Sequence, residues 1–574
     1  MTTLENAKQQ AADALRNALP EGASVAVEDL ARPPQADMGD LSFACFAAAK
    51  SLKQNPAQLA KDAAAKLVPL GLVAEARAVG PYVNVFFDKR AFATAVLEEV
   101  FGRAADFGHA TERKNGRVMI EYGSPNTHKE IHVGHLRNFA LGLSVERLLR
   151  ASGHDVVPVN YIGDVGAHVA KWLWYYDKVR KGEVPGAEPV GDGITAFGKI
   201  YTDATRLAES DEEVYKPQIS AVLQALEKHD PAWEALWLDT RDACLRQMDV
   251  IFRELGIHFE RTYLESEVEG PGKMLVQDLL RRGIAKEGER GAIIVDLSAP
   301  EDLGVFLVLK SDGTALYSTK ELALAGLKFK EFPGVTSSIH IVDTRQSLYF
   351  KQFFATLARM GFKKQMTHLG YEFVTLKEGA MSSRKGNIVT YEDFRDEMIA
   401  MVASETRKRH EDWDDAKVKA TSWAIAEGAM KFGMLKQDND RPITFDMEAA
   451  LSFDGFTGPY VQYGHARLSS ILAKAEGETV SVCTAADDPK EFALLRLVAD
   501  LPQTVSDAAA AYRPSILAQY LFELAQASND FYRDVPVLSA PPADRSRRLA
   551  IVAAARAALA NGLALLGVRA PDEM

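Results

Sequence analysis

Two histidines three positions apart, His132 and His135, give the strongest chemical signal in the sequence. They end the segment SPNTHKEIHVGH (124–135), which follows a run of strand-forming residues and opens a helical pattern. Zinc-binding helices place their histidines four positions apart with further ligands available, so we predict no metal site here. Gly134 leaves room for a flat ring against the backbone, and a helix start offers free amides to phosphate oxygens. The segment therefore predicts a nucleotide site, with an ordinary strand-to-helix turn as the alternative.

The second chemical signal is the loop GAMSSRKGN (379–387), which follows another strand pattern. Its adjacent cations Arg384 and Lys385 stand between glycines, which suits a loop that clamps a pyrophosphate as it leaves. A solvated basic turn explains this loop equally well when it is considered alone. The two loops in this order, each after a strand, favour one nucleotide site.

The elements that would position these loops follow from the apolar patterns. Strand patterns at 118–122 and 156–161 flank the histidine loop and the helix after it, which is typical of a doubly wound, Rossmann-like parallel sheet. A mostly helical stretch follows over about 165–290. Strand patterns then resume in four segments: 291–297, 305–310, 337–343 and 368–374. We predict one sheet split by a helical insertion.

A chain of 574 residues is too long for a single core, so several domains are expected. Near the N-terminus, helical patterns at 3–18 and 55–66 and a strand pattern at 83–87 indicate a separate α/β unit. From about 395 onward the pattern is helical. The predicted divisions are an N-terminal α/β domain (1–112), a Rossmann-like domain with the helical insertion (113–394), a helical connector (395–450) and an all-helical domain (451–574).

Composition excludes some classes of protein but does not identify the function. The net charge of −12 disfavours a uniformly basic nucleic-acid-binding surface, but clusters such as 407–409 allow a local one. The three cysteines are scattered, which excludes a disulfide framework and a four-cysteine zinc site. The first residues lack the pattern of a signal peptide, and we find no apolar run of bilayer length. We expect a cytoplasmic protein without a membrane partner.

The two loops resemble the paired nucleotide-binding signatures of class I aminoacyl-tRNA synthetases, and the surrounding blocks resemble the arginyl-tRNA synthetase family. These blocks follow the family's order along nearly the whole chain. They are PPQADMGDLSFACFAAAK (33–50), EYGSPNTHKEIHVGHLRN (121–138), VNYIGDVGAHVAKW (159–172), IVDTRQSLYFKQ (341–352), FTGPYVQYGHARL (456–468), FYRDVPVLSA (531–540) and NGLALLGVRAPDEM (561–574). The resemblance implies a ligase that activates L-arginine with ATP and transfers it to the 3′ end of tRNA(Arg).

The resemblance implies roles for the histidine loop. His132 and His135 would contact the ATP phosphates and stabilise the transition state at the α-phosphorus, and Gly134 would leave room for adenine. Mg²⁺ would arrive with the ATP rather than sit in a protein cage. The ATP-binding candidates implied by the resemblance are His132, Gly134, His135, Met381, Ser382, Arg384 and Lys385.

The second loop departs from the family-wide Lys-Met-Ser-Lys-Ser pattern, because Ala380 and Ser383 stand at the two lysine positions. In arginyl-tRNA synthetases with such loops, a lysine three residues before the first histidine is thought to supply the missing charge. That position is Lys129 here. Which of Lys129, Arg384 and Lys385 meets the pyrophosphate stays open.

Arginine presents a planar fork of donors, which carboxylates match with paired, charge-assisted hydrogen bonds. The resemblance assigns this role to Glu121 and Glu321, although Asp is more usual at the second position. Without the resemblance, Glu121 would be a surface residue at a strand end and Glu321 one face of a helix. The implied arginine-binding candidates are Glu121, Ser124, Asn126, His135, Tyr317, Glu321 and Gln346.

The resemblance also implies that tRNA(Arg) contacts both ends of the chain. Tyr82 and Asn84 occupy the positions of the N-terminal domain that hold the tRNA elbow, and Tyr460, Gly464 and Met574 those of the anticodon-binding domain. Stacking an aromatic ring on an unpaired base contributes about 1–3 kcal/mol. Core packing is the alternative role for both tyrosines. We further expect arginine activation to require tRNA, and the protein to be a monomer, as is usual in the family.

Two other functions remain as alternatives. A nucleotidyltransferase shares the histidine motif, but such chains are generally shorter and lack an alanine-rich helical C-terminal domain. A catalytically silent RNA-binding relative would be expected to lose the histidines or the glycine, and His132, Gly134 and His135 are all present.

Overall fold

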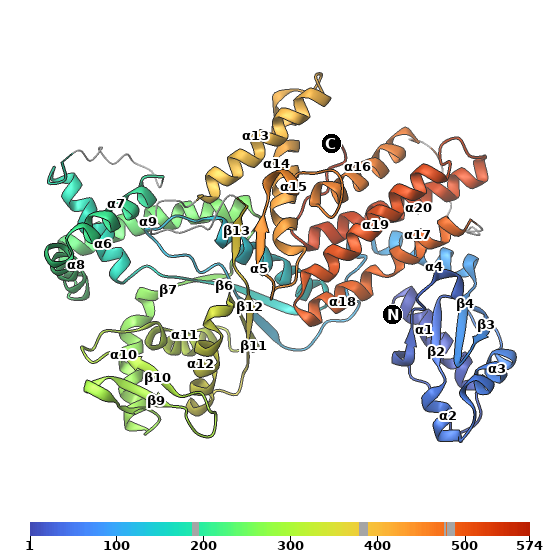
Figure 1. Cartoon of the computed structure of the whole chain (residues 1–574), viewed down its shortest axis with the longest axis horizontal. Helices are drawn as coiled ribbons and strands as arrows, with labels where there is room; N and C mark the ends of the chain where they lie inside the picture. Colours follow the sequence, from blue (N-terminus) through green and yellow to red (C-terminus); the bar gives the residue numbers. More distant parts are fainter. Residues whose placement is uncertain (186–194, 378–388, 476–477, 479–487) are drawn as a thin grey trace.

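A computed structural model describes residues 1–185, 195–377, 389–475, 478 and 488–574. The N-terminal domain (blue in Figure 1) lies at one end of the long axis, next to the C-terminal helices (red). The helices of residues 167–254 (α6 to α9, teal to green) extend to the opposite end. The central sheet lies between the two ends, where segments that are far apart in the sequence converge.

The central sheet has five strands, all parallel, in the order β12-β11-β5-β6-β7. Their bounds are Arg117–Glu121 (β5), Asp155–Ile162 (β6), Arg261–Leu264 (β7), Val335–Asp343 (β11) and Gln365–Tyr371 (β12). β5 and β6 are buried along most of their length, as strands covered on both faces must be. The direction of strand addition reverses between β5 and β11, and ligands of such sheets bind at the carboxyl ends of the strands beside the reversal. The predicted doubly wound parallel sheet is confirmed.

The prediction of one continuous sheet is wrong for the segments 291–297 and 305–310. They belong to a separate antiparallel sheet in the order β10-β9-β8. Its strands are Lys286–Glu287 (β8), Ile293–Asp296 (β9) and Val305–Leu309 (β10). β10 begins with alternating exposed and buried side chains, the pattern of a sheet with one solvated face. Around this small sheet pack α10 (Glu265–Arg281), α11 (Tyr317–Glu331) and α12 (Ser347–Met360).

The stretch predicted as a helical insertion over 165–290 also contains β7, which pairs in parallel with β6. With four residues, β7 is too short to show a strand pattern beside the helices that flank it. The helices before it enclose an aromatic core that includes Trp172 and Trp174. They are α6 (Ala167–Arg180), α7 (Thr195–Ser210), α8 (Glu212–Glu227) and α9 (Pro231–Glu254).

The N-terminal domain combines an antiparallel sheet, in the order β1-β2-β4-β3, with four helices. Thr2 and Glu5 form a capping box at the start of α1. The helices predicted at 3–18 and 55–66 are confirmed as α1 and α3. The bounds are Thr3–Ala18 (α1), Leu30–Ala31 (β1), Leu41–Ala44 (β2), Phe46–Leu52 (α2), Pro56–Lys66 (α3), Val73–Val79 (β3), Tyr82–Phe87 (β4) and Lys89–Arg103 (α4).

The C-terminal part is helical, apart from a short parallel pair formed by β13 (Val374–Leu376) and β14 (Ile443–Phe445). Among the described residues one helix, α20, is long and apolar enough to cross a membrane, which the sequence analysis did not expect. However, 61% of its most apolar stretch is buried, and it packs against α16, α17 and α19 as a core helix. The helices are α13 (Tyr391–Arg409), α14 (Asp415–Leu435), α15 (Met447–Ala450), α16 (Gly458–Lys474), α17 (Pro489–Ala499), α18 (Leu501–Ala511), α19 (Pro514–Asp534) and α20 (Pro542–Leu565).

Candidate active site

The histidine loop connects β5 to α5 (Val133–Ala151), and its two imidazoles cap that helix. Nδ1 of His132 accepts a hydrogen bond from the amide of Gly134 at 3.1 Å. In return, Nδ1 of His135 accepts from the amide of His132 at 3.2 Å. The ring centroids lie 4.0 Å apart. Both side chains therefore lie together at the helix start, at the carboxyl end of β5.

Gly134 is required by this arrangement. A Cβ atom at this position would lie 2.8 Å from Cε1 of His132, well inside contact distance. The sequence predicted that the glycine admits a flat ring, and in this structure the ring beside it is the imidazole of His132. A larger residue would push that imidazole off the helix start.

The capping contacts also determine the protonation of both rings. Because Nδ1 is the acceptor in each imidazole, a neutral ring carries its proton on Nε2. Burial, with a smaller contribution from the charge of Lys129, lowers the pKa of His132 to about 4. Burial, with His132 and Lys129 nearby, holds the pKa of His135 well below its ordinary value. Near pH 7 both rings are thus neutral donors through Nε2–H.

Two buried asparagines that the sequence analysis did not single out hold the first part of the loop. Oδ1 of Asn138, on α5, accepts from the amide of Gly123 at 2.6 Å. Oδ1 of Asn160, on β6, accepts from the amide of Ser124 at 2.8 Å. Ser124 has a φ of 46°, a left-handed conformation that is costly for a residue with a side chain. The predicted contact residue Asn126 forms a parallel bridge with Gly163, just beyond β6.

Glu121, at the end of β5, is 6% exposed, which excludes the alternative of a surface residue. Its carboxylate forms an ion pair with Lys328 on α11 and lies 3.1 Å from Nδ1 of His340 on β11. Burial works to raise the pKa of Glu121, but Lys328 and His340 outweigh it and lower the pKa to about 2. Glu121 is therefore ionised, and it already has a cationic partner in this structure.

Glu321, on α11, lines the same small cavity as Glu121, which ends the sheet strand β5. The hydroxyl of Tyr349 donates to its Oε2 at 2.9 Å. Burial, together with the nearby charge of Glu121, raises the pKa of Glu321 to about 8. The cavity between them measures about 10 Å³, roughly enough for one water molecule. The structure thus brings the two predicted acids together, in opposite protonation states at pH 7.

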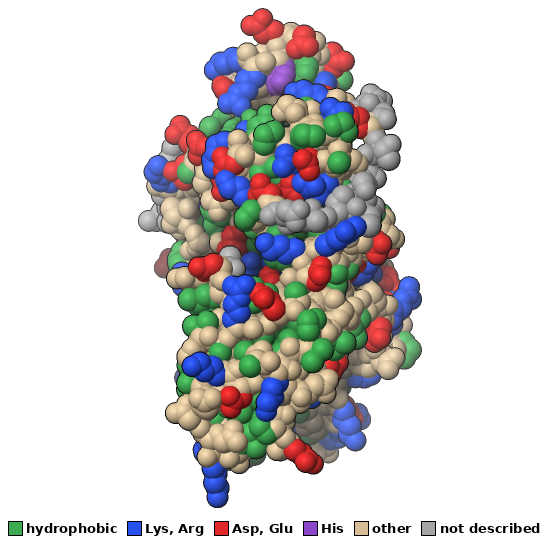
Figure 2. Space-filling model, turned by 90° about the vertical axis from the view of Figure 1, so that its right-hand side faces the viewer, with side chains coloured by type: hydrophobic (Ala, Val, Ile, Leu, Met, Phe, Trp, Pro, Cys, Tyr) green, Lys and Arg blue, Asp and Glu red, His purple; other side chains and the backbone are tan. Residues whose placement is uncertain are grey.

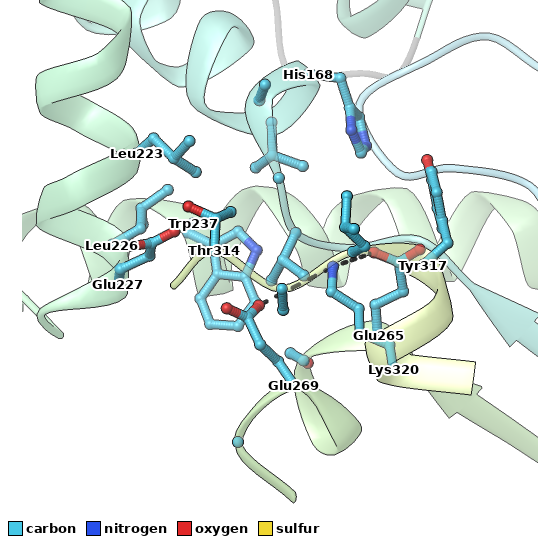
Figure 3. A pocket seen from close by; sticks show the side chains of 18 of the residues that line it. His168, Leu223, Leu226, Glu227, Trp237, Glu265, Glu269, Thr314, Tyr317 and Lys320 are labelled. Carbon is cyan, nitrogen blue, oxygen red and sulfur yellow. Dashed lines mark hydrogen bonds and ion pairs between the residues drawn. The ribbon is translucent and has the colours of Figure 1, made fainter. Parts of the chain in front are cut away.

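A much larger cavity of about 620 Å³ opens between the helical insertion and α11 (Figure 3). Tyr317, which is 59% exposed, lies at its edge near His168. Lys320 and Glu265 form an ion pair of 2.8 Å in its wall. Lys129 lines the cavity too, with its ammonium 5.2 Å from the ring of Tyr201. The predicted residues Tyr317 and Lys129 therefore face the same space.

Other predicted site residues lie apart from these two cavities or outside the described residues. Gln346 is exposed and precedes α12, in the short turn Thr344–Gln346 that follows β11. Met381, Ser382, Arg384 and Lys385 lie outside the described residues. In the parts of the chain that the structure describes, no group of three or more His, Cys, Asp or Glu side chains could hold a metal ion.

The predicted tRNA contacts of the N-terminal domain differ in exposure. Tyr82 is 41% exposed and packs edge-on against Phe46, with ring centroids 5.9 Å apart. Asn84 is buried, and its Oδ1 accepts from the hydroxyl of Ser42 at 2.7 Å. On this end of the molecule, side chains of both charges are interspersed (Figure 2). Tyr82 presents an aromatic ring to solvent, whereas Asn84 joins two strands.

The predicted contacts of the C-terminal domain lie inside or beside the helical bundle. Tyr460 packs on Phe522, and its hydroxyl accepts from Asn529 at 3.1 Å. Gly464 is buried, where a Cβ would lie 3.2 Å from that of Ala525, so it permits close packing of α16 and α19. The carbonyl of Met574 lies 3.1 Å from Nε2 of His410, beside a cavity of about 250 Å³.

Comparison with known proteins agrees with this geometry. A family model described as tRNA synthetases class I (R), catalytic domain, matches residues 98–447. Models described as Arginyl tRNA synthetase N terminal domain and DALR anticodon binding domain match residues 5–87 and 461–574. The chain belongs to the class I aminoacyl-tRNA synthetases.

Individual relatives identify the family within this class. The arginine–tRNA ligase of Bdellovibrio bacteriovorus is 38% identical over 557 residues, which cover 95% of this chain and 94% of the relative. That of Treponema denticola is 35% identical, with 93% and 92% covered. The structure of Thermus thermophilus arginyl-tRNA synthetase matches with a TM-score of 0.79 at 30% identity, covering 99% of both chains. Within its class, the chain is a member of the arginyl-tRNA synthetase family, the arginine–tRNA ligases.

Proposed function

We propose that the chain activates L-arginine with ATP and then transfers the arginyl group to the 3′ end of tRNA(Arg). In the first step a carboxylate oxygen of arginine attacks the α-phosphorus, the bond to the β-phosphate oxygen breaks, and pyrophosphate leaves. In the second step a terminal ribose hydroxyl of the tRNA displaces AMP. The observation that supports this most directly is a pair of neutral Nε2–H donors at the start of the helix that follows β5, while the end of β5 carries Glu121, one of two buried acids that share a cavity.

The histidine loop is suited to the phosphate side of the reaction. His132 and His135 would donate to phosphate oxygens as charge develops, together with the free amides of α5. Lys129 adds positive potential at both rings, and this charge is one cause of the lowered pKa of each histidine. Mg²⁺ would enter with ATP, and the segment that contains Met381, Ser382, Arg384 and Lys385 would bind the leaving pyrophosphate.

On the arginine side, we infer that the substrate's guanidinium takes over the role that Lys328 has in this structure. Glu121 is ionised and Glu321 is largely protonated at pH 7, so the pair carries about one negative charge. An entering guanidinium would favour ionisation of Glu321 and give two carboxylates to its fork of donors. Ser124, Asn126 and His135 would hold the amino and carboxylate groups. Tyr317 would approach the substrate from the large cavity, and Gln346 would have to approach from the exposed turn after β11.

For tRNA(Arg), the N-terminal domain would bind the elbow and the C-terminal domain the anticodon. Tyr82 suits direct stacking because it is exposed. Asn84 and Gly464 are buried, so they would act by shaping the surfaces around them. Tyr460 and the end of the chain at Met574 lie at the edge of the C-terminal bundle. We further propose that activation requires tRNA, and that the protein acts as a cytoplasmic monomer.

Arginine-dependent exchange of pyrophosphate into ATP, with and without tRNA(Arg), tests this function. We expect exchange only when arginine and tRNA are both present. Citrulline has a similar shape but no charge, and a site built on buried carboxylates should reject it by about four to five orders of magnitude. Exchange with citrulline close to that with arginine would refute the roles of Glu121 and Glu321. Exchange without tRNA would refute only the tRNA requirement.

A further inference from the structure

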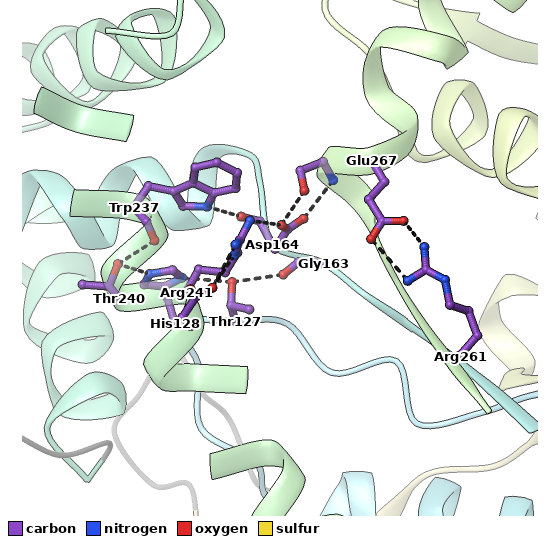
Figure 4. Close-up of polar contacts among 11 residues, drawn as sticks. Thr127, His128, Gly163, Asp164, Trp237, Thr240, Arg241, Arg261 and Glu267 are labelled. Atoms are coloured by element: carbon purple, nitrogen blue, oxygen red, sulfur yellow. Dashed lines mark hydrogen bonds and ion pairs between the residues drawn. The ribbon is translucent and has the colours of Figure 1, made fainter. Parts of the chain in front are cut away.

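His128 joins the part of the histidine loop that precedes α5 (residues 124–132) to the helical insertion (Figure 4). Its side chain is fully buried, with Nδ1 2.9 Å from Oγ1 of Thr127 and Nε2 2.9 Å from Oγ1 of Thr240 on α9. Its amide donates to Sγ of Cys244, one turn further along α9, at 3.3 Å. The residue is thus attached to α9 by both its main chain and its side chain.

The directions of these hydrogen bonds follow from the donor count. The hydroxyl of Thr240 donates to the carbonyl of Leu236 at 2.8 Å. A hydroxyl has one proton, so Thr240 accepts from His128, and the imidazole proton is on Nε2. Nδ1 can then only accept, and the hydroxyl of Thr127 lies closer to Nδ1, at 2.9 Å, than to its other acceptor, the carbonyl of Gly163, at 3.3 Å. Burial lowers the pKa of His128 to about 3, so the ring stays neutral and this chain of hydrogen bonds persists at physiological pH.

The backbone of His128 is strained in a way that its surroundings must maintain. Its φ is 59°, in the left-handed region that disfavours residues with side chains. The ring packs edge-on against Trp172 and Phe197, with centroids 4.9 and 6.1 Å away. Contacts with the insertion therefore hold the loop in a conformation that it would not keep by itself.

A second path connects the same loop to α9 through the end of β6. The amide of Thr127 donates to the carbonyl of Gly163 at 2.9 Å. The next carbonyl, that of Asp164, accepts from the indole of Trp237 on α9 at 2.7 Å. The carboxylate of Asp164 accepts from the amide and hydroxyl of Ser266. Loop, sheet and insertion helix form one hydrogen-bonded unit, and Trp237 also lines the 620 Å³ cavity.

We propose that His128 is a positioning residue, and that its hydrogen bond to Thr240 sets the place of the catalytic imidazoles relative to α9. This rests on the proposed function, since the consequence is the rate of arginine activation. A displacement on the order of 1 Å in such a site can cost about 100-fold in rate. The geometry of the phosphate-binding imidazoles thus comes in part from the insertion, not from the loop alone.

Thr240→Val tests this, because valine keeps the shape of threonine and removes its hydroxyl. At saturating substrates, kcat for charging tRNA with arginine should fall about tenfold, while KM for arginine and ATP stays within about twofold. Thr240→Ser should restore kcat. Thr356→Val is the matched control, because Thr356 is also buried and donates to the carbonyl four residues earlier, at 2.9 Å, but lies on α12. It should leave kcat unchanged.

His128→Asn provides a second variant if Thr240→Val folds poorly. Asparagine tolerates the left-handed conformation but is too short to reach Thr240, so kcat should again fall about tenfold. Hydrogen exchange of the amides in 124–132 gives a readout that does not depend on activity, and it should be faster in both variants than in the control. Wild-type kcat in either variant, or unchanged loop exchange, would overturn the proposal. Failure of the wild-type enzyme to charge arginine would instead refute the proposed function.

Discussion

The proposed phosphate side of the site buries two histidines, and the proposed arginine side buries two glutamates. The surroundings of the two pairs stabilise them in different ways. His132 and His135 are both neutral, and each uses one ring nitrogen to cap the same helix. Glu121 and Glu321 differ in charge, because Lys328 neutralises the first and burial protonates the second. Under the proposed function, the imidazole pair would receive phosphate through its free Nε2–H donors, whereas the carboxylate pair would exchange an internal cation for the substrate.

The largest effect is expected from removing the charge of Glu121. Glu121→Gln leaves the Lys328 ammonium buried without its partner, which should lower the free energy of unfolding by about 3–5 kcal/mol. Denaturant unfolding measures this loss. Glu121→Gln combined with Lys328→Met should recover most of the stability without recovering arginine-dependent activity.

Glu427→Gln is the matched control for Glu121. Glu427 forms an equally buried pair with Lys431 at 2.6 Å, one turn apart on α14, and its other oxygen meets Arg569 at 3.0 Å. This variant should lose comparable stability and keep the wild-type KM for arginine. Equal changes in KM for the two variants would show that Glu121 has no special relation to the substrate.

A smaller loss is expected on the phosphate side. His132→Asn removes the Nε2–H donor but keeps a side chain that caps helices well. Loss of one such donor should lower kcat by about 100- to 1,000-fold while the melting temperature changes little. His132→Ala should lose the cap as well, at a further cost of about 1 kcal/mol of stability. A full-rate His132→Asn enzyme would refute phosphate binding by this ring.

The smallest effect is a pH dependence confined to the arginine side. The pKa of Glu321 is raised from its ordinary value of 4.5 to about 8, so the folded enzyme binds a proton that the unfolded chain has lost. Stability from this group is therefore present below about pH 4.5 and declines as the pH rises towards 8. Over pH 7 to 8.5, KM for arginine should fall roughly five- to tenfold as Glu321 ionises.

Glu321→Gln cannot ionise at this position, so it should show a raised KM that is flat over the same range. It should also remove the decline in stability between about pH 4.5 and 8. A wild-type KM that does not change with pH would mean that Glu321 is already ionised. The two glutamates would then carry the same charge, and the proposed contrast with the histidine pair would be wrong.

The position proposed for the phosphate site could be derived from the sequence because its signal is local. The strand, the loop with its histidines and glycine, and the helix are contiguous over 118–151. The protonation of the rings could not be predicted, because it depends on which nitrogen caps the helix. Likewise, β9 and β10 were assigned to the central sheet because strand patterns do not reveal which strands pair.

The arginine side depends on residues that meet only in the folded chain. Lys328 follows Glu321 by seven positions on α11, so the helical period alone puts both on one face. Nothing in the sequence indicates that this face meets β5, or that Tyr349 donates to Glu321. The raised pKa of Glu321 is thus a property of three segments together. His128 was part of the quoted motif, but its role depends on α9, more than 100 residues later.

The packing of the N-terminal domain on the C-terminal helices has a consequence during synthesis. The side chain of Asn561, on α20, donates to the carbonyls of Ala104 and Phe107, and 457 residues separate it from the first of these. A ribosome adds about 5–20 residues per second, so the first domain waits roughly 20 to 90 seconds for this partner surface. Until the C-terminal helices are made, the face that they cover, where Phe92 meets Phe492, lacks that cover.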